Sequence, residues 1–267
     1  MINLYDLQGN PLSMDGYKGL KLHVPSPSYD IETETIDGQG GAVVVDKKLQ
    51  PRQLTADFYM KAKDYADSLL LRDVIYRQIN EAEFFISEST LPHKRWRVHF
   101  SDAYDMDRLN HFMQTFSVPL VAMSGLAESE GTTLDPLTFT AEKWQVGQGL
   151  ILDEPKYAHE ETTFSIFNAG DVVIDPRQFP LKIIYRGTSN NLQIRNNTTG
   201  DVWTYNGSSG ASDQLILDGV RSLKNGASIF RDTNKKLISI QPGWNDFTLS
   251  GTSGSFLISF EHRFYYY

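Results

Sequence analysis

The chain of 267 residues carries a formal net charge of −8, 40% hydrophobic residues and no cysteine. This apolar fraction is typical of a folded protein, while the lack of cysteine excludes disulfides, thiolate catalysis, zinc ribbons and iron–sulfur clusters. The acidic balance argues against sequence-specific binding or wrapping of nucleic acid, because phosphate contacts need clustered lysine and arginine.

The length suits two domains, and we place the boundary near Leu150, with residues 1–150 and 151–267 on either side. No window approaches the run of about 18 apolar residues that a membrane-spanning helix needs. The opening residues lack a basic region followed by an apolar stretch, so we expect no signal peptide and synthesis in a cytoplasm.

The first sixty residues read as short strands separated by turn residues. Strands are expected at 21–24, 29–36, 42–45 and 51–60, with a glycine-rich turn at 37–41. The spacing of these glycines matches neither a P-loop nor a dinucleotide-binding fingerprint. We therefore interpret the turn as the end of a hairpin.

One helix is predicted at about residues 64–80. Asp64 can cap its first turn, and Asp67 adds an acidic residue there. Apolar residues at helical spacing then form one broad face, which we expect to lie on a sheet. These residues are Ala62, Tyr65, Leu69, Leu70, Val74, Tyr76 and Ile79.

A half-buried strand with a basic outer face is predicted at 94–100. There Trp96, Val98 and Phe100 alternate with Arg95, Arg97 and His99. A solvated or interfacial sheet face fits this pattern better than a nucleic-acid site in an acidic chain. A strand at 112–121 follows, and the small, acidic segment 123–136 reads as an exposed loop.

The C-terminal third reads as one short strand after another, which is typical of a β-sandwich. Gly, Asn or Pro occupies each gap and supplies the backbone conformations that tight turns require. The expected strands are 181–185, 192–195, 201–205, 214–217, 236–240, 247–249 and 255–264, with a turn at 186–191.

Catalytic and metal-binding motifs are missing from the sequence. The carboxylate pairs Asp153/Glu154, Glu160/Glu161 and Glu128/Glu130 fit solvated loops better than a glycosidase site. No Gly-x-Ser-x-Gly elbow occurs, and the histidines lack metal-ligand spacing. We expect no enzyme activity, no metal and no cofactor, and we read His262 as a core residue. The histidines are His23, His93, His99, His111, His159 and His262.

The order of these features resembles the distal tail proteins of siphophages, across nearly the whole chain. The matching segments in the first half are 36–41, 49–54, 95–98 and 116–119. Those in the second half are 167–171, 180–183 with Gly187, 197–200, 217–219 and 241–245. One departure is that Pro119 is followed by Val121-Ala-Met123 and an acidic loop, where the family usually pairs an aromatic residue with proline.

The resemblance implies a mainly β protein with an N-terminal, split-barrel-like ring domain and a C-terminal, galectin-like β-sandwich. It implies a non-enzymatic hub at the virion tail tip, assembled as a hexameric ring through which DNA passes. The tail tube protein would stack on one face and a tail-tip or tail-associated lysin protein on the other, with receptor-binding proteins at the periphery. Exposed strands of the N-terminal half would gain partners through ring closure, and Arg95, Arg97 and His99 are candidates for that interface.

A carbohydrate-binding adhesion module is the alternative function, with a polysaccharide hydrolase third. Aromatic rings stack on sugars and amides bridge hydroxyls, so the candidate contacts are Trp203, Tyr205, Trp244 and Asn245. The competing interpretation, which we favour, is that the two tryptophans fill the core or a domain contact.

Overall fold

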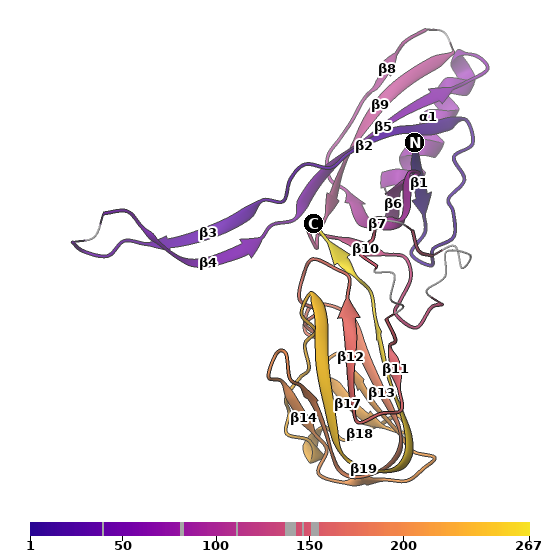
Figure 1. Ribbon diagram of the computed structural model, residues 1–267. Helices are drawn as coiled ribbons and strands as arrows, with labels where there is room; N and C mark the ends of the chain where they lie inside the picture. The colour runs from indigo at the N-terminus through magenta and orange to yellow at the C-terminus, as the bar shows by residue number, and fades with distance from the viewer. Residues whose placement is uncertain (39, 81–82, 111, 137–142, 146, 151–154) are drawn as a thin grey trace. The chain divides into compact units, whose positions relative to one another are not determined.

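A computed structural model describes the chain except residues 39, 81–82, 111, 137–142, 146 and 151–154. The described residues are mainly β with one α-helix, as predicted, and form two compact units (Figure 1). The first unit holds residues 1–128 with Tyr267, and the second holds 129–266. This division precedes the expected boundary near Leu150 because Trp144 packs on Phe264, with ring centroids 5.7 Å apart.

The core of the first unit is a closed antiparallel barrel. Its strands pair in the order β7-β6-β1-β2-β5-β9, and β9 returns to β7 through His99↔Val121 and Phe100↔Leu120. The short β8 (Met106–Arg108) pairs with the outer edge of β9, and β10 (Ala127–Ser129) ends the unit. The barrel strands are β1 (Ile2–Tyr5), β2 (Tyr17–His23), β5 (Arg52–Lys61), β6 (Phe84–Glu88), β7 (Leu91–Phe100) and β9 (Met113–Ala122).

Closure of the barrel corrects one sequence expectation. The margins of the N-terminal sheet were expected to stay unpaired until assembly, but the six strands satisfy one another within a single chain. Alternation along β5 explains the core, because Leu54, Ala56, Phe58 and Met60 all point inward and are buried. Phe58 stacks on Phe116 of β9, with ring centroids 5.2 Å apart.

The helix α1 (Tyr65–Asn80) lies where the sequence predicts it. Asp64 accepts a hydrogen bond from the Asp67 amide, and Asp67 accepts one from the Lys63 amide, so the first turn is capped reciprocally. The predicted apolar face is partly wrong. The helix buries Ile75 and Ile79 with Ser68, whereas Tyr65, Leu70 and Val74 of the predicted face are exposed.

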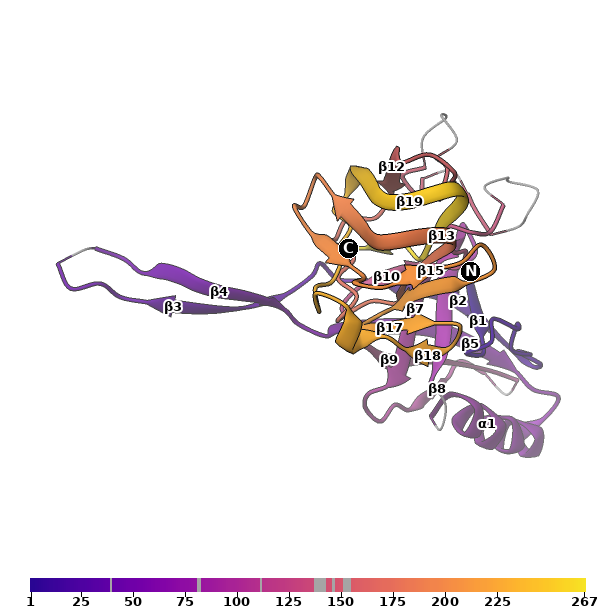
Figure 2. The same cartoon turned by 90° about the horizontal axis from the view of Figure 1, so that it is seen from below.

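A two-stranded hairpin of β3 (Tyr29–Glu34) and β4 (Val43–Leu49) extends away from the barrel (Figures 1 and 2). Within the described residues neither strand pairs with any other strand. The Gln50 amide donates to the Ser28 carbonyl at 3.0 Å, which closes the base where the hairpin leaves the barrel.

The second unit is a β-sandwich built on two long strands, β13 (Leu181–Asn196) and β19 (Gly243–His262). They pair along their length, and register shifts near Gly187, Ser189 and Gln193 bend both into a second layer. The first half of β19 also pairs with β12 (Thr163–Asn168), and its second half pairs with β11 (Ala158–His159). The remaining elements are β14 (Val202–Thr204), β15 (Ser208–Ser209), β16 (Gln214–Asp218), β17 (Arg221–Lys224), β18 (Ala227–Ser228), the 3-10 helix Phe230–Asp232 and β20 (Tyr265–Tyr266).

Three local expectations are wrong in detail. Residues 186–191 continue β13 instead of turning, and 236–240 contribute only a single bridge between Ile174 and Ile240. The segment expected to be an exposed loop contains β10 and buries Leu126, Ala127 and Thr133. The Thr133 hydroxyl donates to the Phe260 carbonyl at 2.6 Å, so long-range packing explains its burial.

Candidate assembly and binding surfaces

The β3–β4 hairpin exposes apolar side chains on a ribbon that has no covering layer. Ile31 is 51% exposed and Val44 is 57% exposed, and Ile36, Val43 and Val45 are exposed as well. Isolated two-stranded hairpins are marginally stable in water, and clustered apolar exposure marks interaction sites. The hairpin is therefore the strongest candidate for a protein contact in the described part of the first unit.

The basic strand predicted as a ring interface has its charges paired within the chain. Arg95 is buried, donates from Nε and Nη2 to Glu128 at 3.2 and 2.9 Å, and lies over the Phe85 ring. Arg97 and His99 both contact Glu83, and hydrogen bonding from Arg97 holds the pKa of Glu83 below its usual range. Arg97 and His99 remain half-exposed, so they are the two of the three that could still contact another molecule.

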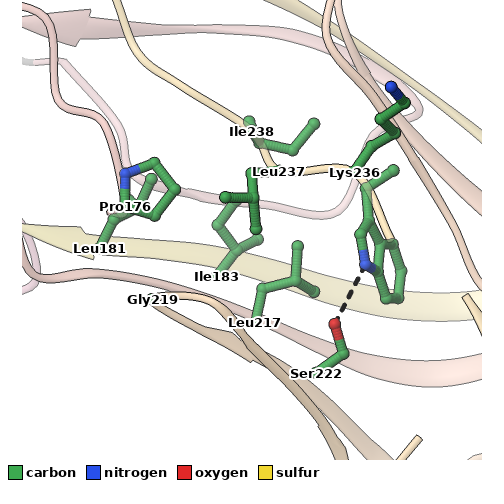
Figure 3. Close-up of a pocket in the computed structure, with 10 residues that line it drawn as sticks. Pro176, Leu181, Ile183, Leu217, Gly219, Ser222, Lys236, Leu237 and Ile238 are labelled. Atoms are coloured by element: carbon green, nitrogen blue, oxygen red, sulfur yellow. Dashed lines mark hydrogen bonds between the residues drawn. The ribbon is translucent and has the colours of Figure 1, made fainter. Parts of the chain in front are cut away.

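Three of the four candidate sugar contacts are buried. Trp203 is 1% exposed, and its Nε1 donates to the Ser222 hydroxyl. Apolar side chains such as Ile183 and Ile238 line this part of the sandwich core (Figure 3). The cavity there measures about 10 Å³, room for at most one water molecule. Tyr205 is also buried. Trp203 and Tyr205 are therefore not placed to stack on a glycan in this fold, and for Trp203 this is the core position that the favoured interpretation expects.

Asn245 is fully buried and organises a turn. Its side-chain oxygen accepts from the Gln241 amide at 2.9 Å, and its Nδ2 donates to the Gln241 carbonyl at 2.8 Å. The segment Gln241-Pro-Gly-Trp-Asn245 is thus held closed by its last side chain. Trp244 is the exposed member, at 47%, and its ring packs against Phe167 with centroids 5.2 Å apart.

The sequence reasoning missed Arg52 at the base of the hairpin. This residue is 4% exposed, and its Nε and Nη2 are buried with no hydrogen-bond partner among the described residues. The alternation of the predicted strand 51–60 indicates that Arg52 is buried, because Arg52 lies on the same strand face as Leu54, Ala56 and Phe58.

The described residues contain no group of three histidine or carboxylate side chains that could hold a metal ion. Of the carboxylate pairs, Glu128 is bound to Arg95, Glu160 and Glu161 are exposed, and Asp153/Glu154 lie outside the described residues, as does His111. Among the described helical residues, no helix is both long and apolar enough to cross a membrane.

Comparison with known proteins gives a family model and a fold. Residues 16–122 match the model of the phage tail protein RIFT-related domain, and no curated protein matches. The crystal structure of the phage SPP1 Dit protein, presented as a paradigm of the hub adsorption apparatus in phages infecting Gram-positive bacteria, gives a TM-score of 0.71 at 13% identity, covering 99% of both chains. A structure of the activated phage p2 baseplate with Sr gives a TM-score of only 0.45 at 8% identity, covering 98% of this chain and 97% of that one. Residues 16–122 therefore match the phage tail protein RIFT-related domain, and the whole chain has the fold of the SPP1 Dit protein.

Proposed function

We propose that this protein is a non-enzymatic hub at the tip of a long, non-contractile phage tail, assembled as a closed hexameric ring. The tail RIFT-related domain and the distal tail protein fold support a structural role in the tail. The observation that carries the ring is the β3–β4 hairpin, an apolar ribbon that pairs with nothing else in the described chain.

Because the barrel is closed within one chain, we place the proposed contact between copies at the hairpin. A ribbon with two free strand edges can add to a neighbouring subunit, and a contact between unlike surfaces repeats around a ring until it closes. Ring closure then covers the exposed Ile31, Val43 and Val44. Because buried apolar area drives association, the ring should lose its stability when the ribbon is removed.

The partners follow from the same proposal. One ring face stacks on the tail tube protein, the other meets the tail-tip or tail-associated lysin protein, and receptor-binding proteins attach at the periphery. Three of the four residues considered for glycan recognition are buried, which favours this structural role over a carbohydrate-binding module.

The first prediction concerns a chain with a shortened hairpin. Tyr29 and Leu49 are paired across the hairpin, so an Asn-Gly turn can join them in place of 30–48. The barrel strands do not need the removed residues, so we expect both cores to fold while the assembled mass falls to that of a monomer. Sedimentation velocity measures the mass, and negative-stain electron microscopy of the intact chain should show an annulus.

A matched control removes exposed valines elsewhere. Val173 and Val220 of the second unit are 43% and 53% exposed, and Val173→Ser with Val220→Ser should leave the assembled mass unchanged. A shortened chain that still assembles, or an intact chain seen only as single globules, would contradict the proposed ring.

A further inference from the structure

We propose that the base of the β3–β4 hairpin is a carboxylate-binding site, in which Arg52 and Lys47 of one copy receive acidic residues from the hairpin of a second copy. This inference rests on the proposed ring. It names the charged residues through which the hairpin of one copy would bind the next copy.

Arg52 carries the first part of the argument. Its guanidinium lies over the Trp96 ring at 5.0 Å, and its Nε and Nη2 are buried with no hydrogen-bond partner. Burial lowers the pKa of Arg52 from its ordinary value; among the described residues the Tyr29 hydroxyl opposes this effect and no carboxylate does. Buried charges in proteins are normally paired, so a cation held this way is incomplete in the single chain.

Other arginines of the same chain show what the Nε and Nη2 atoms of a guanidinium bind in this protein. Arg95, Arg97 and Arg72 each donate from Nε and from Nη2 to a carboxylate, those of Glu128, Glu83 and Asp73. Arg97 places these two nitrogens on the two oxygens of Glu83, whereas Arg95 and Arg72 place both on one carboxylate oxygen. The two nitrogens that Arg52 leaves without a partner are the same two.

Lys47 adds a second cation at the same place. Its Nζ lies 3.9 Å from the centre of the Tyr29 ring. Tyr29 is also close enough to Arg52 for its electrostatic interaction to raise the pKa of Arg52. The neighbouring Lys48 is paired with Asp46 at 2.9 Å, whereas Lys47 has no acidic partner among the described residues. We call Tyr29, Lys47, Arg52 and Trp96 the root cluster.

The hairpin itself supplies the complementary charge. Glu32, Glu34 and Asp37 are exposed on it and form no ion pair among the described residues. Glu34 lies five residues from Tyr29 along an extended strand, roughly 17 Å away, so it cannot fold back to its own root cluster. Glu34 can therefore meet a root cluster only on another copy.

Docking joins the hairpin of one copy, which carries acidic and apolar side chains, to the cationic root cluster of the next copy. The contact is therefore between two different surfaces and repeats in one direction. The long side chain of Arg52 allows its guanidinium to turn towards the surface as the carboxylate arrives. Pairing then compensates a buried cation that the single chain leaves without a partner.

The test uses charge reversal in the full-length chain. One variant carries Arg52→Glu, and the other carries Glu32→Lys together with Glu34→Lys. Each alone places like charges at the contact and should stay monomeric by light scattering, whereas a 1:1 mixture should regain the assembled mass because opposite charges then alternate around the ring. Arg186→Glu, an exposed arginine of the second unit, makes the same charge change as a control and should assemble like the parent.

Arg52→Met separates assembly from folding. Removing a buried cation that lacks a partner should leave the melting temperature of the dilute monomer equal or higher, while association weakens at least about tenfold. Three results would overturn the carboxylate site without contradicting the ring. They are an Arg52→Glu chain that assembles like the parent, a mixture that does not regain the assembled mass, and an Arg52→Met chain that melts at a lower temperature than the parent. A parent chain that never exceeds a monomer would overturn both.

Discussion

His262 is buried in the second unit, where its ring meets Tyr157 and Phe264 edge-on. Nδ1 faces the Arg263 carbonyl at 3.2 Å, while Nε2 has no hydrogen-bond partner in the part of the chain that the structure describes, and burial lowers the pKa of His262 to about 4. The folded unit therefore holds the neutral ring and resists protonation over a range in which the unfolded chain accepts a proton.

The second prediction is an acid-sensitive second unit. The contribution of His262 is complete above pH 6.5 and is lost as the pH falls towards about 4, because only the unfolded chain gains the proton in that window. The loss amounts to roughly 3 kcal/mol of unfolding free energy. In His262→Gln the urea-unfolding free energy should fall less steeply between these pH values than in the parent. Parallel curves for His262→Gln and the parent would contradict the assignment.

Residue-level interpretation from the sequence works where the signal is local. Asp64 was predicted as a helix cap and accepts the expected backbone hydrogen bond, and His262 was predicted to lie in the core. Arg95 and Trp203 differ, because their surroundings come from distant parts of the chain. Glu128 neutralises Arg95, and Trp203 donates a hydrogen bond to Ser222 of another strand.

At the scale of elements, β19 bends where Gly251 and Gly254 lie, and both adopt positive φ values, +80° and +70°. A Cβ on Gly251 would lie 2.5 Å from the Asn191 carbonyl oxygen and 2.6 Å from that of Asn190, whereas one on Gly254 would meet nothing within 4 Å. The two glycines thus share a left-handed backbone conformation and differ in the space around them.

The third prediction compares alanine at these two glycines. Gly254→Ala should lower the unfolding free energy by about 1 kcal/mol, the cost of a side chain in the left-handed region. Gly251→Ala should lower it by about 3 kcal/mol or more, because backbone atoms must also move. Urea unfolding followed by tryptophan fluorescence measures both, and equal losses would show that β13 does not crowd the bend.

Element prediction from the sequence succeeded for the helix and for most strands of the barrel, because alternation and turn residues are local patterns. It failed at 186–191, where a continuous strand crosses a bulge next to Gly187. It also misjudged the buried face of α1, because the barrel decides which side of a helix is covered, and Leu70 and Val74 stay exposed.

At the scale of the whole molecule, the net charge of −8 leads to the fourth prediction. The protein should not be retained on immobilised duplex DNA at about 0.1 M salt, because non-specific retention depends on clustered free cations. Arg95 and Arg97, the basic pair of β7, are neutralised by Glu128 and Glu83. Retention that weakens steadily as salt rises would contradict a passage through which DNA slides without binding.

The sequence by itself determined the mainly β class, the single helix with its cap, the hairpin and the resemblance to distal tail proteins, because each depends on short-range periodicity, turn chemistry or motif order. The tertiary structure alone decided that β9 returns to β7 to close the barrel, that β13 and β19 pass through both layers of the sandwich, and that Arg52 is buried without a partner. The physical reason is that strand pairing and charge compensation join residues far apart in the chain, where one sequence carries no record of which edge meets which.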